Sequence, residues 1–180
     1  MPSRKEKTAA PPNREPGVGK PARAAHGSAA KPKSLDAVTL LERDHREVQG
    51  YFDAYDKAKT DKQKAALAEK ICHALTVHTR VEEELFYPAA RKATGNEDVL
   101  DEAAVEHAGA KQLIAEIEAM TVGEDLYDAK IKVLGEQISH HVEEEEKELF
   151  PQIGQTDLNL VELGQKMEAR KAELMANSKE

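Results

Sequence analysis

HTRVEEELFYP, residues 78–88, and HVEEEEKELFP, residues 141–151, are two stretches of this sequence that follow one frame. Each begins with a histidine, has two adjacent glutamates starting four residues later, continues with an apolar residue beside an aromatic one, and contains a proline ten residues after the histidine. In an α-helix, residues four apart lie on one face about a turn apart. The frame therefore predicts two helices that each present a histidine and a glutamate on the same face.

A second pair of histidines precedes these stretches in the same register. His45 lies 33 residues before His78, and His107 lies 34 residues before His141. Each of the two upstream histidines directly follows an acidic residue. The sequence thus contains the pattern of a helical hairpin, His…His-x-x-x-Glu, twice. Two such hairpins that face one another would close into a pseudo-symmetric bundle.

Apolar residues recur with the period of an α-helix from residue 34 onward, and no segment alternates as a strand does. The periodicity predicts four long helices over about 35–58, 62–87, 97–120 and 126–150, with a short continuation from Pro88 to Gly95 and an end at Pro151. A fifth amphipathic helix is expected over about 157–176. Short connections favour antiparallel neighbours. The predicted fold is all-α, an up-down-up-down four-helix bundle with an extra C-terminal helix.

The composition divides the 180-residue chain into two unlike parts. Residues 1–34 hold six of the eight prolines, and eight lysines and arginines against two glutamates, which predicts a disordered basic tail. The tail has no aromatic residue to stack on bases, so we expect no specific nucleic-acid binding. It is either a solvated arm or a weak contact for an anionic partner. Residues 35–180, which carry the acidic excess of a chain with net charge −8, form the predicted helical domain.

Signals for membranes, export and thiol chemistry are missing from the sequence. No apolar run approaches the roughly 18 residues of a membrane-spanning helix, and the N-terminus lacks the apolar segment of a secretory signal. We therefore expect a soluble, cytoplasmic protein with no membrane contact. The single cysteine, Cys72, excludes a zinc-thiolate cluster and an intramolecular disulfide, and we expect it to be a small buried residue. Histidines and carboxylates must supply any metal ligands.

The apolar stripe of each long helix passes through its histidine, and in the second and fourth helices it also passes through the glutamate. Burying these carboxylates in a small aliphatic core would cost several kcal/mol for each one that lacks a partner. A single histidine on an apolar face is usually a core residue with satisfied hydrogen bonds. Four histidines in duplicated register are not explained in that way, whereas a bound cation removes the contradiction.

The predicted ligand set has four imidazoles, two carboxylates and no sulfur. It is too rich in nitrogen for calcium or magnesium and too large for one tetrahedral zinc ion. Divided between two ions, it gives each ion two histidines with both glutamates bridging, and an added oxo or hydroxo bridge leaves one open position per ion. We therefore predict a centre of two non-haem iron ions, Fe2+ or Fe3+. The six predicted ligands are His45, His78, Glu82, His107, His141 and Glu145.

Other polar residues near the motifs lie outside the duplicated register. The remaining histidines are expected on the surface or next to the ligands: His26, His73 and His140. Two glutamates adjacent to the predicted bridges are expected to be solvated rather than alternative ligands: Glu83 and Glu146. Three tyrosines either line the pocket or pack in the core: Tyr51, Tyr55 and Tyr87.

From about residue 36 to residue 153 the chain resembles the hemerythrin-like family, also called HHE cation-binding domains. The resemblance rests on Asp44-His45, His78-x-x-x-Glu82-Glu83 with Leu85-Phe86 and Pro88, Glu106-His107, and His141-x-x-x-Glu145-Glu146 with Leu149-Phe150-Pro151. It implies an up-down four-helix bundle that encloses two irons with an oxygen-derived bridge. It also implies reversible binding or sensing of dioxygen, or handling of iron, peroxide or nitric oxide.

The sequence departs from the oxygen carriers of this family at two places. The carriers have a fifth histidine four residues after the third one, where this chain has Lys111. Their second bridging carboxylate is an aspartate five residues after the last histidine, whereas Glu145 follows His141 by four. Both departures make the predicted site more symmetric, and both argue against simple oxygen carriage.

The leading expectation is a di-iron protein that binds or senses dioxygen or another small redox ligand. The alternative is a di-iron oxidoreductase that consumes peroxide or oxidises ferrous iron. The histidine-rich ligand set, without a Glu-x-x-His motif, disfavours ferrous-iron oxidation but leaves peroxide consumption open. A regulatory module whose basic tail docks a partner is a third and weaker interpretation, since the sequence predicts no second folded domain.

Overall fold

The computed structural model describes residues 35–177, which form helices and connecting loops without a β-strand. The all-α fold predicted from the sequence is thus confirmed. None of the helices in this part of the chain is long and apolar enough to cross a bilayer. The predicted disordered tail, residues 1–34, lies outside the described residues. The helical segments are α1 (Ala37–Lys57), α2 (Asp61–Val81), η1 (Glu82–Phe86), α3 (Tyr87–Thr94), α4 (Asp98–Glu118), α5 (Tyr127–Glu144), η2 (Glu145–Leu149), α6 (Phe150–Ile153) and α7 (Leu160–Asn177).

Local side-chain chemistry sets the ends of the first helices. The Asp36 side chain accepts a hydrogen bond from the Thr39 backbone N–H at 3.1 Å and caps α1. Thr60 and Gln63 form a reciprocal capping box at the start of α2. α3 ends at Gly95, whose φ of 66° is the left-handed conformation that glycine adopts without strain.

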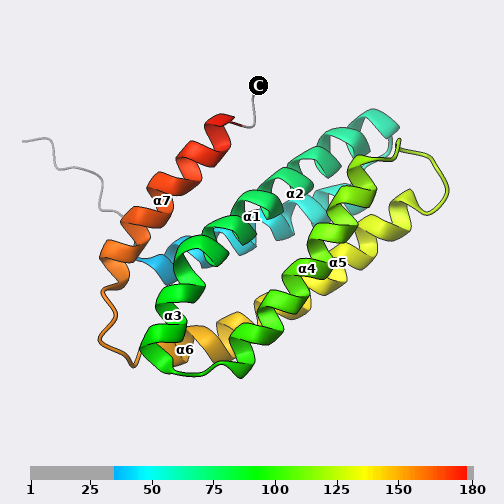
Figure 1. Ribbon diagram of the computed structural model, residues 1–180. Helices are drawn as coiled ribbons and strands as arrows, with labels where there is room; N and C mark the ends of the chain where they lie inside the picture. Colours follow the sequence, from blue (N-terminus) through cyan, green and yellow to red (C-terminus); the bar gives the residue numbers. More distant parts are fainter. Residues whose placement is uncertain (1–34, 178–180) are drawn as a thin grey trace, which may run out of the picture. The chain divides into compact units, whose positions relative to one another are not determined.

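Four long helices, α1, α2, α4 and α5, form the bundle (Figure 1). α1 packs against α2 and α4 against α5, and the two hairpins meet where α2 contacts α4 and α1 contacts α5. The buried apolar residues form two clusters, one around Leu41 and Phe86 and the other around Leu75 and Ile138. Each of α1, α2 and α4, and α5 together with its continuation through η2, passes from one cluster to the other near its histidine, so the histidines form a polar layer between two apolar ones.

The C-terminal helix α7 runs along α1 and α2 and also contacts η1 (Figure 1). Met167 of α7 is fully buried in the cluster around Leu41 and Phe86. Gly164 permits this packing, because a Cβ atom at that position would overlap the backbone of residues 35–37 at the start of α1. Ion pairs add to the contact, with Arg170 Nε 2.6 Å from Glu84 Oε2. The predicted fifth helix is therefore an integral part of the helical domain.

Two π-helical turns, η1 and η2, precede the two prolines and were not predicted from the sequence. A proline inside an α-helix lacks an N–H, and its ring clashes with the carbonyl group four residues earlier. For Pro88 and Pro151 those carbonyl groups belong to residues 84 and 147, inside the π turns. The wider turns accommodate the rings, and the helix continues. The prediction that the fourth helix ends at Pro151 was wrong, since α6 extends to Ile153.

Candidate metal centre

The structure brings the six residues predicted as ligands together at the centre of the bundle, and all six are buried. One histidine comes from each long helix, and the two glutamates are the first residues of η1 and η2. Whether they bind metal stays a prediction, but their geometry falls into two groups of potential ligand atoms. The first group is His45, His78, Glu82 and Glu145, and the second is Glu82, His107 and His141.

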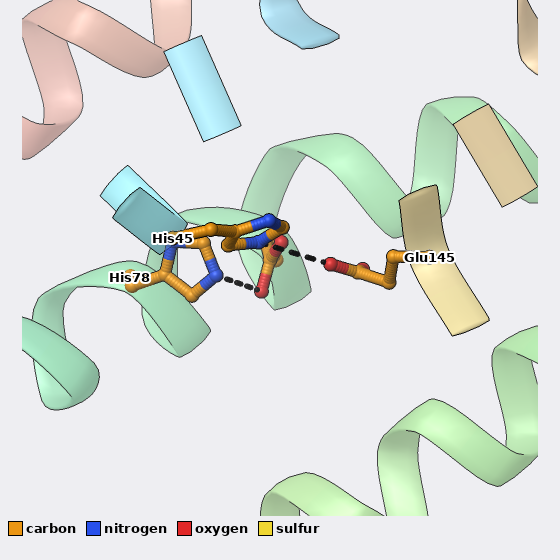
Figure 2. Close-up of side chains that lie close together, drawn as sticks. His45, His78 and Glu145 are labelled. Carbon is orange, nitrogen blue, oxygen red and sulfur yellow. Dashed lines mark ion pairs between the residues drawn. The ribbon is translucent and has the colours of Figure 1, made fainter. Parts of the chain in front are cut away.

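The first group joins α1, α2 and both π turns. His78 Nε2 lies 3.2 Å from Glu82 Oε2, and His45 Nε2 lies 3.3 Å from Glu145 Oε2. The two imidazole rings meet edge to face with their centroids 4.9 Å apart. Figure 2 shows His45, His78 and Glu145 converging on one point from their separate segments. Ligand atoms so close together can surround one cation.

The second group joins α4 and α5 to the same glutamate. His107 Nε2 lies 3.1 Å from His141 Nε2 and 3.4 Å from Glu82 Oε2. Glu145 also approaches this group, with its Oε2 atom 3.7 Å from His141 Nε2. Glu82 therefore belongs to both groups, which is the position of a bridging carboxylate.

The Glu82 carboxylate has no exposed surface, and neither of its oxygens accepts a hydrogen bond. Burial and the neighbouring Glu145 raise the pKa of Glu82 well above its usual value. At Glu145 the nearby imidazoles of His45 and His141 and the hydrogen bond from Tyr87 outweigh burial, so its pKa is lowered. A buried carboxylate without a donor is costly, and a cation between the histidine pairs would satisfy it. The donor set thus fits a metal.

Glu83 and Glu146 each contact the Nδ1 atom of one imidazole, on the side of the ring that faces away from the centre. Glu146 Oε1 lies 3.0 Å from His45 Nδ1, and Glu83 Oε1 lies 3.1 Å from His107 Nδ1. Both glutamates are partly exposed, as predicted, but their hydrogen bonds fix the orientation of the rings and leave Nε2 directed at the centre. The prediction missed this contact. The sequence contains a signal for this contact, because each of these two glutamates directly follows a glutamate predicted to bridge the metal ions.

The acidic residues that precede the upstream histidines differ in their partners. Glu106 Oε2 lies 2.7 Å from His141 Nδ1. Asp44, the equivalent residue of the first hairpin, instead forms an ion pair with Lys171 of α7 at 2.7 Å. His78 Nδ1 is buried and has no hydrogen-bond partner. Burial and the other histidines hold the pKa of His78 well below its usual value, so the ring is neutral.

Of the three tyrosines singled out in the sequence, Tyr87 lines the centre. Its hydroxyl donates to Glu145 Oε1 at 2.9 Å and lies 3.2 Å from His107 Nε2 and 3.4 Å from His141 Nε2. Burial and the carboxylates of Glu82 and Glu145 raise the pKa of Tyr87. Tyr51 and Tyr55 point elsewhere: they donate to Glu47 and Asp128.

The histidines predicted to lie outside the ligand set are absent from the two buried groups. His140 is exposed and forms a separate group with Glu106 and Glu144, whose ligand atoms also lie close together. Partly buried His73 contacts Met175. Cys72 is buried in the apolar cluster around Leu75, away from both groups. His26 lies outside the described residues.

Comparisons with known proteins agree with this fold. A solved structure, that of a hemerythrin HHE cation-binding domain-containing protein from Mycobacterium kansasii, matches with a TM-score of 0.69 at 24% identity, over 79% of this chain and 89% of that one. At this identity the match shows the shared fold. A protein described as a DNA nickase, from Nostoc sp. (strain PCC 7120 / SAG 25.82 / UTEX 2576), is 26% identical over 121 residues, which are 67% of this chain. Those residues span 34% of the nickase, about a third of its length.

The family comparison covers the whole bundle. The profile of the Hemerythrin HHE cation binding domain matches residues 36–153, from the N-cap of α1 to the end of α6. This range contains both His/Glu groups and both π turns. The protein therefore belongs to the hemerythrin HHE cation-binding domain family, and its buried His/Glu groups can hold a metal ion.

Proposed function

We propose that this protein holds two non-haem iron ions in a carboxylate-bridged centre and there binds or senses dioxygen or a related small redox ligand. The observation that carries the proposal is the Glu82 carboxylate, which is fully buried, has no hydrogen-bond donor and is shared by the two His/Glu groups. His45 and His78 would hold one ion and His107 and His141 the other, with Glu82 and Glu145 between them.

The chemistry of the donor atoms supports iron. Neutral imidazoles with carboxylates and no thiolate suit iron better than calcium or magnesium, and two linked groups exceed the needs of a single tetrahedral zinc. The surroundings keep two of the four imidazoles neutral: burial and the nearby His141 lower the pKa of His107 to about 4, and burial and the other histidines hold the pKa of His78 well below its usual value. A pair of bound irons would supply the redox-active positions for the ligand.

The space beside the histidines suits a small ligand. A cavity of about 10 Å³ adjoins all four imidazoles and is also lined by the apolar side chains of Val48, Leu75 and Ile138 and by Asp44 and Thr79. That volume is about what one water molecule requires, so the space suits only a ligand of very few atoms.

The alternative is a di-iron oxidoreductase that consumes peroxide or oxidises ferrous iron. One observation favours peroxide consumption: the Tyr87 hydroxyl is a buried proton donor 2.9 Å from Glu145. Nicking of DNA is not part of the proposal, because the matched region covers only 34% of the nickase.

Iron analysis and rapid mixing test the proposal. Protein grown with iron should retain about two irons per chain after gel filtration and show a ligand-to-metal charge-transfer band. One zinc per chain and no iron would overturn the di-iron centre. Stopped-flow mixing of the reduced protein with dioxygen, then with peroxide, separates the activities. A stable adduct supports binding, slow irreversible oxidation supports sensing, and turnover of excess peroxide supports the alternative.

A further inference from the structure

We propose that Glu106, His140 and Glu144 form an outer site, which binds one divalent transition-metal cation at the surface of the bundle. Glu106 comes from α4, and the other two residues come from α5, which packs against α4. The outer site shares no residue with the two buried His/Glu groups. It therefore goes beyond the proposed function, which concerns the buried centre alone.

Three ligand atoms converge in the outer site. One atom from each of its side chains lies within 4.8 Å of the other two. His140 Nε2 lies 3.2 Å from Glu144 Oε1 and 3.8 Å from Glu106 Oε1. Two ligand atoms that are each about 2.1 Å from one ion lie about 3–4 Å apart. One ion can therefore contact the imidazole together with both carboxylates after small side-chain movements.

The first hairpin has a positive charge at the position that corresponds to the outer site. Asp44 is the counterpart of Glu106, because each directly precedes an upstream histidine. The Asp44 carboxylate lies 2.7 Å from the ammonium group of Lys171 in α7. Within residues 35–177, Glu106 forms ion pairs with His140 and His141 and with no lysine or arginine. A bound cation would do for Glu106 what the ammonium group does for Asp44.

The other two residues of the outer site also have counterparts in the first hairpin. In the register of the downstream histidines, His140 and Glu144 correspond to Val77 and Val81. Both valines are buried in the same apolar cluster as Met167 of α7. The second hairpin thus replaces two apolar residues by two side chains of the kinds that bind metals. It does so on the hairpin that lacks the ammonium group.

The donor atoms define the class of cation. One imidazole and two carboxylates without sulfur suit a divalent ion such as Mn2+, Fe2+ or Zn2+, and water can complete the coordination at an exposed site. Glu106 can serve both sites at once, because its Oε2 atom lies 2.7 Å from His141 Nδ1 while Oε1 faces His140. Filling or emptying the outer site therefore leaves the support of His141 in place.

Titration of the iron-loaded, full-length protein with Mn2+ tests the inference, with free Mn2+ measured by electron paramagnetic resonance. Mn2+ forms the weakest complexes of its series, so it should leave the buried irons in place. We expect the wild-type protein to bind one Mn2+ per chain in a saturable manner. His140→Ala and Glu144→Gln each remove one ligand, so both variants should lose this binding and keep their iron.

Glu143→Gln is the matched control, because it removes the same charge from the neighbouring residue of α5, whose partner is Lys147. The control should bind Mn2+ as the wild type does. An equal loss in the control would indicate general attraction to an acidic surface and overturn the outer site. Unchanged binding by His140→Ala, or no binding by the wild type, would overturn it too. A chain that holds no iron contradicts only the proposed function, since the difference between wild type and His140→Ala still decides the outer site.

Discussion

The hairpin of α1 and α2 and the hairpin of α4 and α5 present their histidines in the same register but surround them differently. In the second hairpin, Glu106 binds the Nδ1 atom of His141. In the first, Lys171 of α7 binds Asp44, and the Nδ1 atom of His78 has no partner. Asp44 thus holds α7 and gives no support to the histidine of its own hairpin. The repeat keeps the histidines, the buried glutamates and the contacts of Glu83 and Glu146, and it differs in the partner of the acidic residue before the upstream histidine.

The equivalent histidines of the two hairpins also differ in basicity. Burial alone would lower the pKa of His45, but the carboxylates of Glu145 and Glu146 outweigh it and raise that pKa. At His107, burial and the neighbouring His141 outweigh Glu83, and the pKa falls to about 4. The comparison teaches that a doubled motif need not give two equal sites.

Replacing Glu82, the residue common to both His/Glu groups, should have the largest effect. Glu82→Met removes the shared carboxylate, so we expect the iron content to fall from about two per chain to nearly none. The metal-free variant should be more stable than the metal-free wild type by roughly 1–4 kcal/mol, because a buried polar group without a donor is gone. Iron analysis and urea unfolding measure the two effects. Exposed Glu148→Met serves as the control, and retention of two irons by Glu82→Met would contradict the bridge.

Removing one histidine from each hairpin should have the next largest effect. His78→Ala and His141→Ala each delete one imidazole from one group, so each variant should retain about one iron or less. Iron per chain and the charge-transfer band report the loss. His73→Ala and His140→Ala are the matched controls on the same helices, and both should keep two irons. Loss of iron from the controls alone would show that the ligands were wrongly chosen.

The pH dependence of the metal-free protein should distinguish His45 from His107. Between pH 6.5 and about 4 the unfolded chain takes up a proton at residue 107 that the native protein does not, so His107 lowers stability as the pH falls. The loss amounts to about 3 kcal/mol, and His107→Gln should remove it. His45 should change the free energy of unfolding in the opposite direction. Its stabilising contribution is present below pH 6.5 and is lost as the pH rises through its raised pKa.

Urea unfolding of both glutamine variants across pH 4–8 measures these contributions. The two variants should change the slope of stability against pH in opposite directions. A change in the same direction for His45→Gln and His107→Gln would contradict the prediction that the two histidines differ in basicity.

The supporting acidic residues should have the smallest effect. Glu106→Ala frees the Nδ1 atom of His141 and should weaken iron binding about 10–100-fold. Asp44→Ala disturbs α7 but no imidazole, so it should change iron affinity less than tenfold. Competition with a chelator measures both affinities. Equal losses in the two variants would mean that Asp44 supports His78 after all.

The sequence predicted what depends on helical periodicity. The four histidines and two glutamates were found because each lies on an apolar stripe, where a polar residue requires an explanation. The contacts of Glu83, Glu146 and Tyr87 were not found, since they depend on side-chain directions between different helices. The pairing of Asp44 with Lys171 requires the docked position of α7, for which the repeat has no counterpart. The π turns were missed because a proline after a helical pattern usually marks its end.

In a regular helix, the spacing of the His and Glu residues also fixes the direction of the aromatic residue that follows them. The π turns make that direction independent of the spacing. A π turn holds about one residue more than an α turn, which shifts everything after it by roughly 100° around the axis. Deleting one residue from 83–86 would keep His78 and Glu82 in phase yet rotate Tyr87 away. Changes in chain length after the glutamates would thus alter the aromatic neighbour of each metal position and leave the His and Glu donors in place.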